Sequence, residues 1–186
     1  MNTANKLTVL RMVMVPFFVL FMLCKEIPYS TIWALAIFAV ASLTDHIDGK
    51  LARERNMVTN FGKFLDPMAD KILVLSAMTC MIPLGLCHPV VVIIVIAREF
   101  LVSSLRLVAA SQSIVIAAGR SGKIKTASQM ISIVAVLALQ SIENVFCLGI
   151  PVPLISQCLM WLTAAIAVWS GTEYIIKNYR LIDPKQ

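Results

Sequence analysis

Four aspartates in one short stretch are the residues of this sequence best suited to chemistry. Asp45 and Asp48 are three residues apart, and Asp66 and Asp70 are four apart. On a helix, either spacing places both carboxylates of a pair on one face. Four carboxylates brought together repel one another, so they need cationic partners or bound metal. Hard divalent cations such as Mg²⁺ and Ca²⁺ prefer carboxylate oxygen, and two such ions would cancel the four charges and suit the binding of a diphosphate.

The residues around the aspartates leave two interpretations open. Local cations could pair with the carboxylates and make a salt-bridged interfacial loop instead of a metal site; these are Lys50, Arg53, Arg55, Lys63 and Lys71. Gly49 directly follows Asp48 and would let a ligand approach the backbone. Arg53, four residues later, could grip a phosphate with its planar guanidinium. Gly62 could relieve crowding near the start of the next helix, although a turn or close helix packing would explain either glycine equally well.

Apolar runs on both sides of this stretch must position it. Of 186 residues, 59% are hydrophobic and 14% are charged, whereas ordinary soluble domains carry about 25% charged residues. A membrane span needs about 20 apolar residues. The sequence predicts six spans, at about 7–24, 31–43 with a polar helical extension to 53, 59–83, 89–110, 122–140 and 154–174. We therefore expect an all-α polytopic membrane protein, a single domain over residues 1–186 with six transmembrane helices.

Two local expectations accompany these spans. Pro67 is acceptable if it falls in the first turn of the third helix. Residues 141–153 are expected to form a loop between the fifth and sixth helices. The N-terminus lacks the cleavage pattern of a secretory signal, so the first apolar run is expected to remain as a span.

The distribution of basic residues predicts the orientation of the protein. With six spans, 15 of the 16 Lys and Arg residues fall toward one face, and Lys25 alone falls toward the other. Cytoplasmic loops of membrane proteins carry the excess of Lys and Arg. Both termini and the aspartate motif are therefore expected at the cytoplasmic side.

A second charged group follows the aspartates: Arg98, Arg106, Lys123 and Lys125. The two arginines are eight residues apart, about two helical turns, and so share a face. The two lysines cannot point in one direction on an ideal helix. Charges so close to apolar runs need a partner, a water-filled cavity or contact with anionic headgroups. We prefer an anion site for Arg98, Arg106 and Lys123, headgroup contact for Lys125 and Arg120, and local pairing for Glu99.

The cysteines and histidines carry no clear site. Five cysteines are scattered, odd in number and without a C-x-x-C pair, so small apolar filler is a better interpretation than disulfides or zinc. They are Cys24, Cys80, Cys87, Cys147 and Cys158. His46 lies between two of the aspartates, and we do not include it in the site.

The aspartate stretch resembles the CDP-alcohol phosphotransferase family. It matches the pattern D-x2-D-G-x2-A-R-x8-G-x3-D-x3-D at every fixed position: Asp45, Asp48, Gly49, Ala52, Arg53, Gly62, Asp66 and Asp70. Eight fixed residues at fixed spacing make a specific signal. The segment Asn5-x2-Thr8-x2-Arg11 is similar to the N-terminal segment of the family, although Ala4 stands where a proline is usual. The segments 97–100, 105–106 and 122–126 resemble the bacterial phosphatidylglycerophosphate synthase branch.

The resemblance implies roles for the residues that match. Two divalent ions, Mg²⁺ or Mn²⁺, would be bound by Asp45, Asp48, Asp66 and Asp70. Asp70 would also act as the general base. The CDP group would be contacted by Gly49, Arg53 and Thr59, with Asn5 and Thr8 as further candidates. The phosphate of glycerol 3-phosphate would be bound by Arg98, Arg106, Lys123 and Lys125.

The same resemblance implies the reaction and the setting. CDP-diacylglycerol and sn-glycerol 3-phosphate would give phosphatidylglycerophosphate and CMP, a step of phospholipid biosynthesis. The expected location is the bacterial cytoplasmic (inner) membrane, with the active site facing the cytoplasm. Membrane lipids and a second copy in a homodimer are the expected partners, and no nucleic acid is expected.

Three alternatives stay open. A sister enzyme could use inositol phosphate, serine or phosphatidylglycerol as acceptor. A divalent-cation transporter could also use intramembrane aspartates, but its site would be expected nearer the bilayer midplane. A prenyl transferase also binds diphosphates with aspartate-rich metal motifs, but its pairs would be more widely separated in sequence.

Overall fold

The computed structural model is all-α and describes residues 3–24, 26–54, 60–112, 114 and 119–179. Within its helices, the side chains of residues 3–7, 45–54 and 60–67 lie outside this description. The described residues form six helices, which confirms the predicted all-α class and the predicted number of helices. These helices are α1 (Thr3–Leu23), α2 (Ser30–Glu54), α3 (Asn60–Met81), α4 (Pro89–Ser111), α5 (Arg120–Phe146) and α6 (Val152–Lys177).

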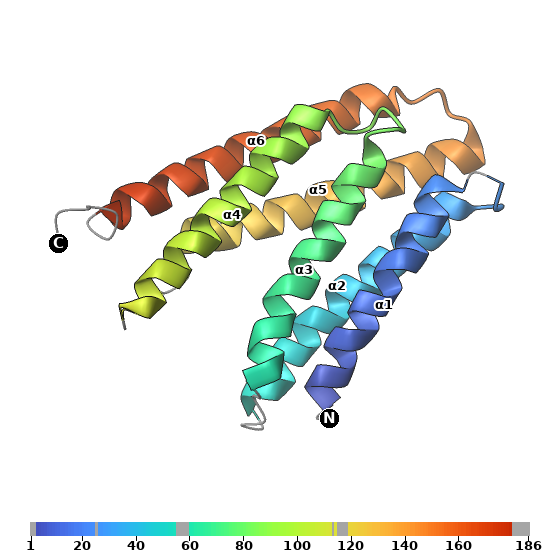
Figure 1. Ribbon diagram of the computed structural model, residues 1–186. Helices are drawn as coiled ribbons and strands as arrows, with labels where there is room; N and C mark the ends of the chain where they lie inside the picture. Colours follow the sequence, from blue (N-terminus) through green and yellow to red (C-terminus); the bar gives the residue numbers. More distant parts are fainter. Residues whose placement is uncertain (1–2, 25, 55–59, 113, 115–118, 180–186) are drawn as a thin grey trace.

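Successive helices run in opposite directions, as Figure 1 shows. The N-terminal ends of α1, α3 and α5 and the C-terminal ends of α2, α4 and α6 therefore lie at one end of the molecule. We call this the open end, because α4 and α6 diverge there from α1, α2 and α3 (Figure 1). The opposite, closed end carries the α3–α4 and α5–α6 connections. Helix α1 packs against α2 and α3, while α6 packs against α4 and α5.

Helix α2 passes without a break from an apolar half into the aspartate motif, as predicted. Helix α3 begins at Asn60, so Pro67 falls inside it and not in its first turn. The expectation for this proline is therefore wrong. A proline inside a helix removes one backbone hydrogen bond, and membrane helices tolerate this where neighbouring helices or side chains compensate.

The end of α5 also differs from the prediction. Residues 141–153 were expected to form a loop, but the helix continues to Phe146. Ser141 donates a hydrogen bond to the backbone carbonyl one turn earlier at 2.7 Å, so this polar side chain is satisfied within the helix. The carboxylate of Glu143 then accepts hydrogen bonds from the amide of Gly149 at 3.1 Å and from the next amide at 3.0 Å. These contacts end the helix later than its polar composition indicated.

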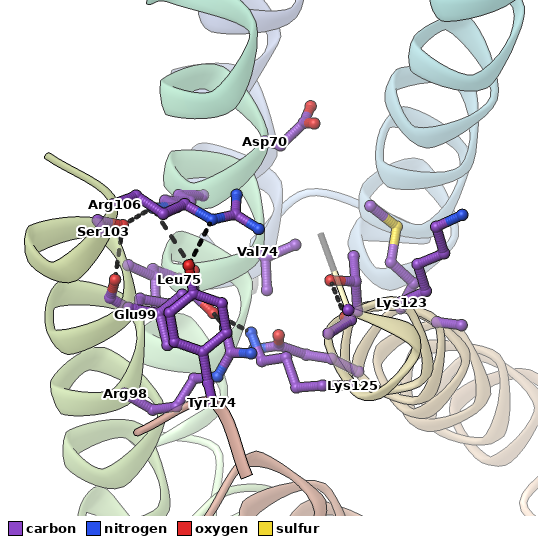
Figure 2. A pocket seen from close by; sticks show the side chains of 18 of the residues that line it. Asp70, Val74, Leu75, Arg98, Glu99, Ser103, Arg106, Lys123, Lys125 and Tyr174 are labelled. Atoms are coloured by element: carbon purple, nitrogen blue, oxygen red, sulfur yellow. Dashed lines mark hydrogen bonds and ion pairs between the residues drawn. The ribbon is translucent and has the colours of Figure 1, made fainter. Parts of the chain in front are cut away.

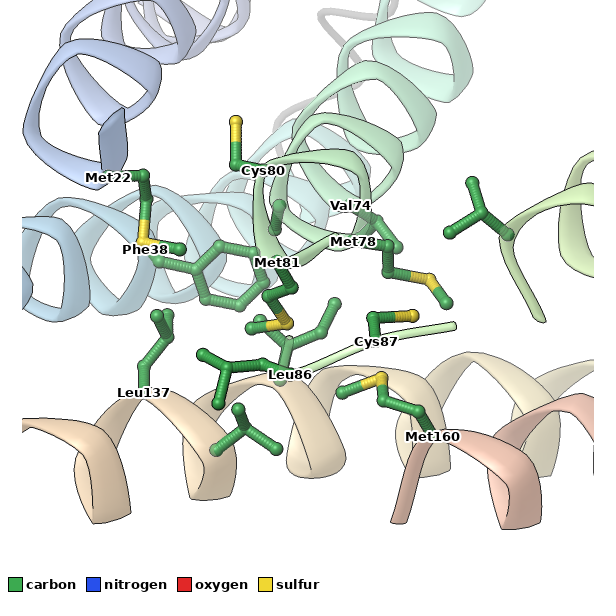
Figure 3. Close-up of a cluster of buried hydrophobic side chains, with 14 of the residues drawn as sticks. Met22, Phe38, Val74, Met78, Cys80, Met81, Leu86, Cys87, Leu137 and Met160 are labelled. Carbon is green, nitrogen blue, oxygen red and sulfur yellow. The ribbon is translucent and has the colours of Figure 1, made fainter. Parts of the chain in front are cut away.

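Apolar side chains fill the closed end. Figure 3 shows methionines and other side chains from several helices converging there; they include Met22, Phe38, Met78, Met81, Leu86, Leu137 and Met160. Cys80 and Cys87 are buried in the same cluster, as the filler interpretation predicted. Burial raises the pKa of the Cys87 thiol, in the α3–α4 connection, to about 11. Cys147 and Cys158 are exposed, so this interpretation is wrong for those two.

The outer surface is strongly apolar. By length and composition, α5 and α6 could cross a membrane, and α1 and α2 contain shorter apolar stretches, Thr8–Leu23 and Ser30–Thr44. Every helix exposes large apolar side chains, among them Phe17, Trp33, Met68, Ile93, Ile131 and Trp169. Such a surface is compatible with a membrane protein. The number of spans and the side on which the termini lie stay predictions.

Candidate active site

The aspartate motif lies on α2 and α3, at the open end. Asp45 and Asp48 lie in the last turns of α2, and Asp66 and Asp70 lie in the first three turns of α3. The backbone thus places both pairs at the same end of the molecule. Six predicted site residues have side chains or positions outside the described part of the chain, so their roles stay predictions: Asn5, Asp45, Asp48, Gly49, Arg53 and Asp66. Thr59 lies wholly outside the described residues.

Asp70 is the motif aspartate whose side chain is described. Nη1 of Arg11 on α1 donates a hydrogen bond to Oδ1 of Asp70 at 2.6 Å. The Arg11 side chain is 2% exposed, whereas that of Asp70 is 35% exposed. A buried cation therefore anchors one edge of a carboxylate that remains accessible.

Thr8 lies one turn before Arg11 on α1 and is buried. The spacing of three residues places both side chains on one face of the helix. Sequence reasoning gave Arg11 no role, although this spacing was available as a signal. The structure therefore adds Arg11 to the candidate site, and the CDP contact of Thr8 stays a prediction.

A cavity of about 680 Å³ connects Asp70 with the basic residues of the following helices. Figure 2 shows Asp70 on α3 above the basic side chains of α4 and α5, which lie on both sides of the view. Five cations and two carboxylates line it, which leaves a formal charge of +3. The cavity brings together all four basic candidates with the predicted general base: Arg98, Arg106, Lys123, Lys125 and Asp70.

Glu99 on α4 is the centre of a charged cluster beside this cavity. Its Oε1 accepts hydrogen bonds from Nη1 of Arg98 at 3.0 Å and from Nζ of Lys125. Its Oε2 lies 3.6 Å from Nζ of Lys71 on α3. One carboxylate therefore joins cations from three helices. The predicted local pairing of Glu99 is confirmed and extends further than expected.

Lys125 does not lie at the molecular surface, where the sequence predicted that it would contact lipid headgroups. Its side chain is 4% exposed and points from α5 toward Glu99 (Figure 2). The expected contact with lipid headgroups is wrong for this residue, because the Glu99 carboxylate compensates the lysine charge inside the molecule. Arg120, for which the same contact was expected, is exposed.

Arg106 lies two turns after Arg98 on α4 and lines the same cavity, as the spacing of eight residues predicted. Its Nε donates a hydrogen bond to the hydroxyl oxygen of Tyr174 on α6 at 3.3 Å. The guanidinium carbon lies 5.8 Å from the centroid of the Tyr174 ring. Lys123, in the first turn of α5, is exposed and also lines the cavity.

Helix α6 contributes more to the site than sequence reasoning found. Nη2 of Arg98 donates a hydrogen bond to Oγ of Ser170 at 2.8 Å. A Cβ atom at Gly171 would lie 3.1 Å from Cγ of Arg98, so the glycine permits close packing of α4 against α6. No signal in the spacing marked these positions, since small residues are common wherever membrane helices pack.

The structure describes only part of the predicted metal site. Among the described residues, no three Asp, Glu, His or Cys side chains come together as metal ligands. Three of the four predicted ligands have side chains outside the description. The donor set fits a hard divalent cation, because it consists of carboxylates that the backbone brings to one end of the molecule.

Comparison with known proteins defines the class of this protein. A family model described as CDP-alcohol phosphatidyltransferase matches residues 1–169. The chain belongs to the CDP-alcohol phosphatidyltransferase family and is a transferase, which confirms the resemblance of its motif. Membership in this family sets aside the transporter and prenyl transferase alternatives.

Individual relatives cover nearly the whole chain. It is 38% identical to the CDP-diacylglycerol–glycerol-3-phosphate 3-phosphatidyltransferase of Bacillus subtilis (strain 168), over 97% of each chain. It is 38% identical to the probable phosphatidylglycerophosphate synthase of Mycobacterium tuberculosis (strain H37Rv), over 96% of this chain and 82% of the relative. It is 31% identical to the CDP-diacylglycerol–glycerol-3-phosphate 3-phosphatidyltransferase of Rickettsia bellii, over 93% of each chain.

Proposed function

We propose that the protein transfers the phosphatidyl group from CDP-diacylglycerol to sn-glycerol 3-phosphate, giving phosphatidylglycerophosphate and CMP in phospholipid biosynthesis. The observation that carries this proposal is the cavity, which is lined by an accessible carboxylate and a group of cations and has a net formal charge of +3. Such a space suits an acceptor that has a phosphate at one end and a reactive hydroxyl at the other. The names of the relatives from Bacillus subtilis and Rickettsia bellii point to the same acceptor.

The residues of the chain divide the chemistry between them. The acceptor hydroxyl attacks the phosphorus that bears the diacylglycerol, its proton passes to the Asp70 carboxylate as general base, and the bond to the departing CMP breaks. Arg11 holds one edge of that carboxylate through the 2.6 Å hydrogen bond. The cations of α4 and α5 bind the acceptor phosphate and orient the hydroxyl toward Asp70.

The aspartate motif and the N-terminal segment supply the metal and CDP sites in this proposal. Asp45, Asp48, Asp66 and Asp70 would hold two divalent ions, Mg²⁺ or Mn²⁺. When bound, these ions stabilise negative charge on the diphosphate. The CDP group would lie against Gly49, Arg53, Thr59, Asn5 and Thr8. The position of Thr8 supports this placement, since it lies one turn from Arg11 on the same face of α1.

We further propose that residues 1–186 form one domain with six transmembrane helices in the bacterial cytoplasmic membrane, with both termini and the site facing the cytoplasm. The large apolar side chains exposed on every helix support this setting, and the open end gathers the basic residues typical of a cytoplasmic face. The acyl chains of the donor would lie in the bilayer, and the soluble acceptor would enter from the cytoplasm. The family resemblance also implies a homodimer, whose mass in detergent can be measured directly.

Release of CMP by the purified protein in detergent tests the proposed function. CDP-diacylglycerol and Mg²⁺ would be supplied with glycerol 3-phosphate, inositol phosphate, serine or phosphatidylglycerol in separate reactions. We expect CMP only with glycerol 3-phosphate, and only while a divalent ion is present. Release with another acceptor would retain the family chemistry and reject the acceptor. Release that persists in excess chelator would reject the metal proposal.

A further inference from the structure

The cations that line the cavity are of two kinds. Arg98 donates a hydrogen bond from Nη1 to Glu99 and another from Nη2 to Ser170. The buried Lys125 also donates a hydrogen bond to Glu99. Both cations thus also bind side chains of the protein itself, in addition to lining the cavity. Arg106 differs, because it is exposed and only its Nε donates a hydrogen bond within the described residues.

The hydrogen bond from Nε determines how the rest of Arg106 is presented. A guanidinium is planar, so the hydrogen bond at Nε and the nearby Tyr174 ring, whose centroid lies 5.8 Å from the guanidinium carbon, restrict its orientation. The two Nη atoms then remain as a pair of parallel donors, the arrangement that matches a phosphate in a bidentate fashion. Figure 2 shows the Arg106 guanidinium directed into the cavity, beyond the ring of Tyr174.

Tyr174 is well placed to hold this orientation. Its side chain is buried, at 7% exposure, so its own position is fixed by the packing of α6. Ser170 lies four residues earlier and therefore on the same face of α6, where it binds Arg98. One face of α6 thus supports both arginines of α4.

We propose that Tyr174 is a positioning residue, which aims the paired Nη atoms of Arg106 into the cavity and thereby sets the affinity for the phosphate of the acceptor. This inference rests on the proposed function, because it deepens the assignment of the same cavity. Tyr174 also lines the cavity, but in this proposal it makes no direct contact with the acceptor. It acts through Arg106, so its effect is expected on acceptor binding and not on the chemical step.

The first test is the kinetics of Tyr174→Phe, which keeps the ring and removes only the hydroxyl. Loss of one hydrogen bond should raise the KM for the acceptor about three- to tenfold, with kcat and the KM for CDP-diacylglycerol within about twofold of the wild-type values. Tyr29→Phe is the matched control, because it removes the same hydroxyl from an exposed tyrosine at the closed end; it should change none of these constants. An unchanged acceptor KM in Tyr174→Phe would overturn the proposal.

A second test separates positioning from general packing. Arg106→Lys retains the charge and has no Nε, so Tyr174→Phe should add no further increase of the acceptor KM in that background. Equal effects of Tyr174→Phe in the two backgrounds would mean that the hydroxyl acts elsewhere and would overturn the proposal.

Inorganic phosphate provides a readout that does not depend on turnover. The thermal unfolding midpoint of the wild-type protein should rise with phosphate concentration, and Tyr174→Phe should need about three- to tenfold more phosphate for the same rise. If glycerol 3-phosphate is not the acceptor but this difference is found, the proposed function fails and the Tyr174 inference stands. If glycerol 3-phosphate is used but neither the KM nor the phosphate response differs, the Tyr174 inference alone fails.

Discussion

The closed and open ends of the molecule hold the same helices together by different forces. At the closed end, side chains such as Met81, Leu137 and Met160 have no exposed surface and pack against one another. At the open end, Glu99 joins cations from α3, α4 and α5 beside a cavity. Apolar packing fixes the helices where they converge, which leaves them free to diverge and carry charge at the other end. Stability and substrate binding should therefore respond to substitution at opposite ends.

The largest effect is expected for Asp70→Asn at the open end. The amide keeps the size of the side chain and can still accept a hydrogen bond from Arg11, but it cannot take a proton. CMP release should fall by a factor of about 10²–10⁴, measured with both substrates at saturation. The variant should stay folded and bind CDP, seen as an increase of its thermal unfolding midpoint.

Glu26→Gln is the matched control for Asp70→Asn. It makes the same carboxylate-to-amide change in the exposed α1–α2 connection at the closed end, and its activity should equal that of the wild type. Near-normal turnover by Asp70→Asn would reject the general base assignment.

Glu99→Gln should lower the stability of the protein, although Glu99 lies at the open end. The substitution removes the carboxylate charge and leaves the buried Lys125 charge without compensation. Breaking one partner of a buried ion pair costs about 3–5 kcal/mol, which should appear as a lower unfolding midpoint in detergent. The double variant Glu99→Gln, Lys125→Met should recover most of this loss, since it removes the stranded charge. A midpoint equal to that of the wild type in the single variant would contradict the structure of the cluster.

Leu137→Ala tests the closed end. This side chain has no exposed surface, so truncation should leave a cavity and cost about 2–5 kcal/mol of stability. The KM for either substrate should stay the same, because Leu137 does not line the active-site cavity. Leu154→Ala removes the same atoms from an exposed position on α6 and should change the unfolding midpoint little in detergent. A raised acceptor KM in Leu137→Ala would show that the two ends are coupled.

The helices could largely be predicted from the sequence, because long apolar runs alternate with short polar connections. The passage of α2 from apolar to polar residues was also predictable, since it needs only a continuous helix. The end of α5 was not, because the polar residues near Ser141 indicate a loop until their hydrogen bonds are known. The predicted start of the third helix near residue 59 agrees with the observed start at Asn60, and Pro67 therefore lies about two turns into the helix and not in its first turn.

The site was predictable where spacing along one helix decides it. Arg98 and Arg106 share a face because they are eight residues apart, and both line the cavity. Contacts between distant helices could not be found in this way. Tyr174 and Ser170 lie more than sixty residues after the arginines that they support, and Lys125 could not be placed against Glu99 without the packing of α5 on α4. Arg11 was visible as a motif residue, but its bond to Asp70 depends on how α1 packs against α3.

Arg106→Ala should give the smallest of these effects and the most specific one. The variant removes the guanidinium that Tyr174 holds at the cavity, and loss of hydrogen bonds to a charged group costs about 1.5–3 kcal/mol. The KM for glycerol 3-phosphate should therefore rise about 10- to 150-fold, while the KM for CDP-diacylglycerol changes much less. Arg120→Ala is the matched control, because Arg120 is exposed on α5 and does not line the cavity. A similar rise in both KM values for Arg106→Ala would mean that the cations of the open end serve the donor as much as the acceptor, and the division of the cavity into a carboxylate side and a phosphate side would be wrong.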